Sequence, residues 1–70
     1  SPDRIFLDSN LNKIIETFFI KKDINEQNIF NYEELMKFFN SYYEKGFLIK
    51  RQIVTTILFQ IWYKKVLSLE

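Results

Sequence analysis

The sequence predicts a small all-α domain in which three to four helices pack in an orthogonal or bundle-like arrangement. Three observations lead to this fold class. Apolar residues recur at steps of three and four in three separate segments, which is the period of a helix with one buried side. The chain has only one glycine and one proline to break helices. Its 70 residues form a single domain, residues 1–70, and 47% of them are hydrophobic, which suits a chain so short that it needs a dense core.

The first helix is expected over residues 9–22. Its apolar stripe consists of Leu11, Ile14, Ile15, Phe18 and Phe19. Lys21 and Lys22 follow the stripe, where positive charge stabilises the C-terminal end of a helix. A short apolar segment at residues 5–7 precedes this helix and is expected to pack on the core.

The second helix is expected over residues 32–45, because its start, its apolar face and its end are all marked. Asn31 is a good N-cap and Glu34 stands at the third helical position, which together make a variant of the capping box. The apolar stripe consists of Leu35, Phe38, Phe39 and Tyr42. Gly46 supplies the residue with positive φ that often ends a helix.

The third helix is expected over residues 49–66. Its apolar stripe consists of Ile53, Val54, Ile57, Leu58, Ile61 and Trp62, and Trp62 is expected in the core. Several β-branched residues near its start also suit a strand. The segment runs for about sixteen residues without a turn signal, which is longer than a usual strand, so we predict a helix.

Composition argues against an enzyme. The chain has no histidine and no cysteine, so the usual general base, metal ligands and thiol nucleophile are missing. A single glycine excludes the glycine-rich phosphate loops. Glu33 and Glu34 are adjacent, and adjacent helical side chains point about 100° apart. We therefore expect no cofactor and no small-molecule substrate.

Charge is distributed unevenly along the chain. Residues 1–44 carry five bases and eight acids, a net of −3, whereas residues 45–69 carry five bases and no acid, a net of +5. No uncharged run reaches the roughly 20 residues of a membrane-spanning helix. An intracellular domain that belongs to a larger protein is expected.

Residues 23–34, which read DINEQNIFNYEE, lie between two apolar stripes. This segment resembles the twelve-residue calcium loop of an EF-hand, and the wider resemblance covers residues 14–42. It implies six oxygen ligands: Asp23, Asn25, Gln27, the carbonyl of Ile29, Asn31 and Glu34. The family's glycine is replaced by Asn28, only two ligands are charged, and no second loop follows, so any calcium binding is expected to be weak. A metal-free helix–loop–helix explains the same pattern.

The segment 32–62 resembles a helix-turn-helix, with a turn around Gly46 and a second helix that begins with basic residues. The resemblance implies that the start of this second helix contacts nucleic acid. Its contact residues would be Lys50, Arg51, Gln52, Thr55 and Thr56. A solvated helix face explains the same residues.

Aromatic and aliphatic residues exceed what three short helices can bury, since 13 residues are Phe, Tyr or Trp. A contiguous exposed apolar patch is therefore expected, and such patches mark partner surfaces. We predict a non-catalytic protein–protein interaction or self-association module, whose partner is another protein or a second copy. The expected anchors are Tyr43, Phe47, Phe59 and Tyr63. The alternatives are a nucleic-acid-binding helix-turn-helix and a calcium-responsive EF-hand.

Overall fold

A computed structural model describes the backbone of residues 2–68 and the side chains of residues 9–68. The backbone forms α1 (Pro2–Phe18), α2 (Lys21–Gln27), α3 (Tyr32–Lys45), the 3₁₀ turn η1 (Gly46–Leu48) and α4 (Lys50–Ser68). No strand occurs within residues 2–68. The all-α prediction is confirmed.

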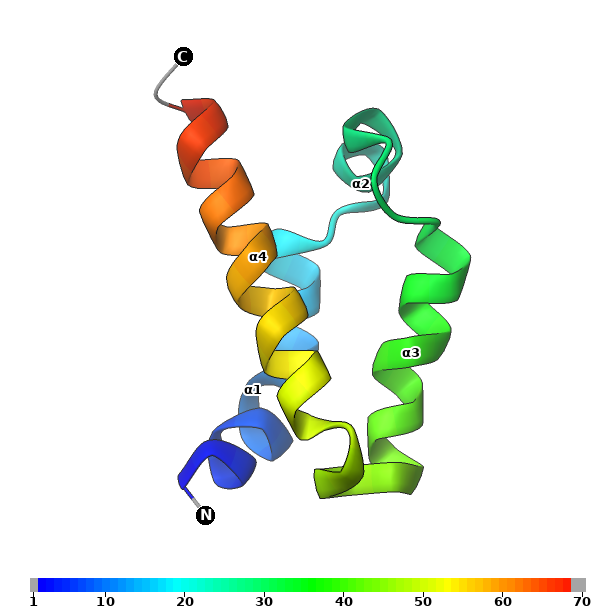
Figure 1. Ribbon diagram of the computed structural model, residues 1–70, viewed down its shortest axis with the longest axis vertical. Helices are drawn as coiled ribbons and strands as arrows, with labels where there is room; N and C mark the ends of the chain where they lie inside the picture. Colours follow the sequence, from blue (N-terminus) through cyan, green and yellow to red (C-terminus); the bar gives the residue numbers. More distant parts are fainter. Residues whose placement is uncertain (1, 69–70) are drawn as a thin grey trace.

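The helices form an open, flat arrangement (Figure 1). α3 and α4 run in nearly opposite directions and are joined by η1, α1 packs against α4, and the short α2 lies crosswise beyond the start of α3. The principal extents are 36 × 24 × 17 Å. Since a helix with side chains is about 10–12 Å wide, the thinnest dimension holds no more than two helices. Each helix therefore keeps one side at the surface.

The core draws on all four helices. Its buried apolar residues are Leu11, Phe19, Ile24, Leu35, Phe39, Tyr42, Ile53 and Ile57. At its centre the rings of Phe19 and Phe39 meet edge to face, with centroids 4.8 Å apart. Ile24, which has no exposed surface, is the residue through which α2 joins this core. None of the helices in the described part of the chain is long and apolar enough to cross a bilayer.

The expected first helix differs most from the structure. α1 begins at Pro2 and ends at Phe18, so it includes the segment 5–7 that was expected to precede it; the side chains of residues 5–7 lie outside the described residues. The chain then turns through an extended Ile20 (φ −69°, ψ 130°), and Lys21 and Lys22 start α2 instead of ending α1. The turn allows both Phe19 and Ile24 to reach the core.

The second predicted helix is confirmed at both ends, since α3 covers Tyr32–Lys45. The Asn31 side-chain oxygen accepts a hydrogen bond of 2.9 Å from the backbone N–H of Glu34. The reciprocal half of the capping box is not formed, because the Glu34 carboxylate lies 3.4 Å from the Lys37 ammonium instead. Gly46 ends the helix with a positive φ of 54°.

Candidate functional site

The residues of the calcium-loop resemblance do not form one loop. Asp23, Asn25 and Gln27 belong to α2, so the expectation of a loop is wrong for this part of the segment. Asn28 does adopt the left-handed conformation (φ 58°), but it does so at the C-terminal end of α2. The exposed Ile29 follows, Asn31 caps α3, and Glu34 lies in its first turn.

Most of these side chains already have partners. The Asp23 carboxylate binds the Lys64 ammonium at 2.8 Å, and the Gln27 amide bonds to Gln60. Within residues 9–68 no three acidic, histidine or cysteine side chains gather in a way that could hold a metal ion.

Four of the five candidate nucleic-acid residues share one surface. Arg51, Gln52, Thr55 and Thr56 line a shallow hollow of about 380 Å³ on the first turns of α4. The threonine hydroxyls donate to the helix backbone, Thr55 to the Arg51 carbonyl and Thr56 to the Gln52 carbonyl, each at 2.8 Å. The fifth residue, Lys50, is half-buried.

The four predicted protein-binding aromatics divide into two groups. Tyr43 and Phe47 are exposed at the junction of α3 and η1, where the Tyr43 hydroxyl donates to the Asn12 side chain at 3.0 Å. Phe59 and Tyr63 lie along α4 and are half-buried. The structure therefore does not bring the four residues into one patch.

Two faces of α4 have opposite environments. The buried residues Ile53, Ile57 and Gln60 follow each other at steps of four and three and face the core. The exposed residues of the opposite side are Arg51, Thr55, Leu58, Trp62, Lys65 and Val66, and we call them the outer face of α4. They also recur at steps of four and three, and the last step from Trp62 reaches both Lys65 and Val66. Leu58 and Trp62 were expected in the core, and this expectation is wrong: they are 60% and 58% exposed.

Gln60 explains why the buried side of α4 differs from the predicted stripe. Its side chain has no exposed surface and donates to the Phe18 carbonyl at 2.9 Å, near the end of α1. It also exchanges two hydrogen bonds with the Gln27 amide of α2. Because Gln60 points inward, the helix is rotated so that Leu58 and Trp62 point outward.

The ring of Trp62 packs against a cluster of aromatic side chains. Its centroid lies 6.0 Å from that of Phe59, which also contacts the rings of Tyr63 at 5.9 Å and of Phe30 at 5.7 Å. Phe30 precedes α3 and packs on the core. The exposed indole therefore rests against a row of rings that continues through Phe59 and Phe30 to the core.

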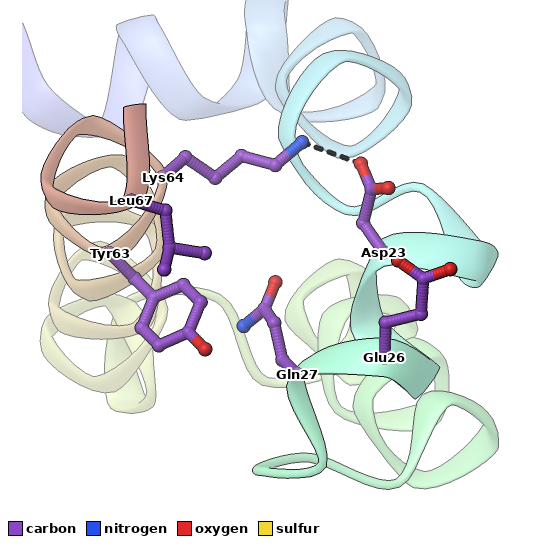
Figure 2. A pocket seen from close by; sticks show the side chains of 6 residues that line it. All are labelled: Asp23, Glu26, Gln27, Tyr63, Lys64 and Leu67. Carbon is purple, nitrogen blue, oxygen red and sulfur yellow. Dashed lines mark hydrogen bonds and ion pairs between the residues drawn. The ribbon is translucent and has the colours of Figure 1, made fainter. Parts of the chain in front are cut away.

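A second feature lies between α2 and α4 (Figure 2). It is a hollow of about 420 Å³ lined by Asp23, Glu26, Gln27, Tyr63, Lys64 and Leu67. The Lys64–Asp23 ion pair spans the hollow from α4 to α2. The Tyr63 ring and Leu67 also project from α4, and they lie across the hollow from α2. The lining thus combines the Asp23–Lys64 ion pair with a second carboxylate, Glu26, and the amide of Gln27, so the hollow offers charged and polar contacts.

One signal in the sequence indicated the outer face. From Ile57 to Tyr63, six of seven consecutive residues are apolar, so apart from Gln60 the side chains of two turns of α4 are apolar all round the helix. A helix that is apolar all round is normally buried all round. In a molecule that is two helices thick, one of these sides must face solvent.

Comparisons with protein-family models, with curated proteins and with solved structures gave no match for this chain. The class that the fold and the site define is a small all-α domain with an exposed apolar row on one helix.

Proposed function

We propose that this domain is a non-catalytic protein-interaction module that binds its partner through the outer face of α4. The observation that carries the proposal is the row of Leu58, Trp62 and Val66, three large apolar side chains exposed at successive turns of one helix. Scattered exposed apolar residues are ordinary, whereas a contiguous row indicates an interaction surface.

The composition of the face also suits binding. Tryptophan and arginine are the residues most enriched among the few that dominate binding energy, and the face contains Trp62 near its apolar centre and Arg51 at its edge. Thr55 and Lys65 add a polar edge. An apolar centre with a polar rim is the usual composition of a protein interface.

The proposal is tested by selecting binders of the domain from a displayed library of random-sequence peptides. The selected peptides are then titrated into isotope-labelled domain, and the amide shifts are mapped by NMR. We expect the largest shifts at Leu58, Trp62 and Val66. Leu58→Ser should weaken the selected peptides about tenfold or more, as loss of an interface anchor does.

Leu48→Ser is the matched control, because Leu48 is equally exposed, at 67%, but lies on η1. It should leave the affinity unchanged. Peptides whose shifts map to Tyr43 and Phe47 would place the interface at the other end of α4. Tight binding of duplex DNA at Arg51 and Gln52, with no peptide selected, would assign the domain to nucleic acid instead.

A further inference from the structure

We infer that the outer face of α4 binds an acidic amphipathic helix supplied by a different protein, an inference that rests on the function proposed above. The first reason is shape. From Arg51 to Val66 the face runs straight for about 22 Å, at 1.5 Å per residue. The apolar row from Leu58 to Val66 takes up about 12 Å of this length, at 1.5 Å per residue, and matches about two turns of a partner helix that packs alongside it.

The second reason is charge. Residues 45–68 carry five bases and no acid. Lys64 is neutralised by Asp23. Within the described part of the chain, however, Arg51 and Lys65 on the outer face form no ion pair. Their positive charges flank the apolar row, so a partner with acidic residues beside its own apolar row is favoured.

A second copy of this chain does not supply such a partner. Two α4 helices related by a two-fold axis would bring Arg51 and Lys65 of both copies to one interface, where like charges repel. A head-to-tail contact needs an acidic helix with an exposed apolar row. The exposed positions of α3 are polar apart from Tyr43, and those of α1 within residues 9–18 are all polar. The exposed positions of α2 are polar as well, so within residues 9–68 no helix combines exposed acids with an exposed apolar row.

The experiment uses Trp62, the only tryptophan of the chain, as a reporter placed in the proposed interface. Three capped 18-residue helical peptides share one Leu/Ala apolar side and carry Glu, Gln or Lys at the same surface positions. Each is titrated into the intact domain at physiological salt while the emission of Trp62 is recorded. Circular dichroism checks that the domain and its variants are folded.

We expect the Glu peptide to shift the Trp62 emission to the blue with saturation, the Gln peptide to bind about tenfold more weakly, and the Lys peptide to leave the spectrum unchanged. Lys65→Glu should weaken the Glu peptide severalfold. Lys22→Glu makes the same change of net charge on the exposed side of α2 and should have little effect. Leu58→Ser should remove the response, and Leu48→Ser should preserve it.

The alternatives give different results. Equal binding of the Glu and Gln peptides overturns the acidic partner and leaves the interaction face intact. An emission shift that depends on domain concentration without peptide, with a dimer in sedimentation, identifies a second copy and overturns the inference. A Trp62 spectrum that no peptide changes, from this set or from the random library, overturns the proposed function itself.

Discussion

Gln60 has no exposed surface, yet every hydrogen-bonding group of its amide is used. The nitrogen donates to the Phe18 carbonyl and to the Gln27 oxygen, and the oxygen accepts from the Gln27 nitrogen. The last carbonyls of a helix lack partners within it, so Gln60 satisfies one at the end of α1. A single side chain on α4 thus connects α1 and α2.

Replacing Gln60 with leucine should destabilise the domain by about 1–3 kcal/mol, because the Phe18 carbonyl and the Gln27 amide lose their partners. The free energy of unfolding is measured by urea titration. Gln52→Leu, the same change on an exposed side of α4, should stay within about 0.5 kcal/mol of the wild type.

The double variant Gln27→Leu with Gln60→Leu should lose less than the sum of the two single variants, since removing both amides leaves fewer unpaired groups. Strictly additive losses would mean that the two amides do not interact.

The sequence was misleading about the burial of individual residues on α4, and the reason is physical. A glutamine between Phe59 and Ile61 suggests a solvent-facing position, and the predicted apolar stripe does not include it. Its burial depends on a carbonyl 42 residues away in sequence, which no local pattern reveals. Trp62 was assigned to the core in error for the same reason.

Helices with local signals at both ends were predictable. α3 matches its predicted range because Asn31, the apolar stripe and Gly46 act within the segment itself. α4, expected at 49–66, extends over Lys50–Ser68. The break between α1 and α2 has no glycine or proline, and it arises because Phe19 and Ile24 both enter the core. A tertiary cause of this kind leaves no mark on local periodicity.

The cap of α3 gives a prediction at the scale of the element. Asn31→Ala should lower the free energy of unfolding by about 0.5–2 kcal/mol, because the N–H of Glu34 loses its acceptor. Urea titration with and without calcium measures it. Asn40→Ala, at an exposed position inside the same helix, should cost nothing, since alanine favours helix. A loss confined to calcium-loaded protein would instead make Asn31 a metal ligand.

Calcium titration tests whether residues 23–34, which include α2, bind the ion. We expect no saturable calorimetric signal at micromolar calcium. To form a calcium loop, α2 would have to unwind, which would expose Ile24 and break the Asp23–Lys64 ion pair. Only two carboxylates would compensate for these losses. Saturation at that concentration, removed by Glu34→Gln, would establish the EF-hand resemblance as functional.

The charge asymmetry predicted from the sequence belongs to the whole molecule. The net charge is −3 over residues 1–44 and +5 over residues 45–69, but the sequence did not reveal which of the bases are exposed and unpaired. The fold separates them: Lys64 is held by Asp23, whereas Arg51 and Lys65 lie exposed beside the apolar row. The candidate surface therefore combines a charge pattern visible in the sequence with a rotation of α4 that only packing decides.

This layout predicts how salt should affect binding. Basic residues at the rim of an interface speed the encounter with an acidic partner, whereas the buried apolar centre governs its residence time. Raising the salt concentration from about 50 to about 500 mM shortens the Debye screening length from about 14 to about 4 Å. This change should slow the association of the acidic peptide severalfold. Its dissociation rate should change little. Stopped-flow measurement of Trp62 emission gives both rates.

Leu58→Ser should show the opposite behaviour, with faster dissociation and nearly unchanged association, because it shortens the apolar row without altering charge.

Duplex DNA is the control ligand. A nucleic-acid-binding domain would lose affinity linearly in log–log against salt, with a slope set by the phosphates it contacts. In that case Arg51→Ala would weaken a preferred site more than random duplex, since base contacts provide specificity and phosphate contacts do not. A salt dependence confined to the association rate, together with no measurable DNA affinity, is the result that a protein-binding α4 requires.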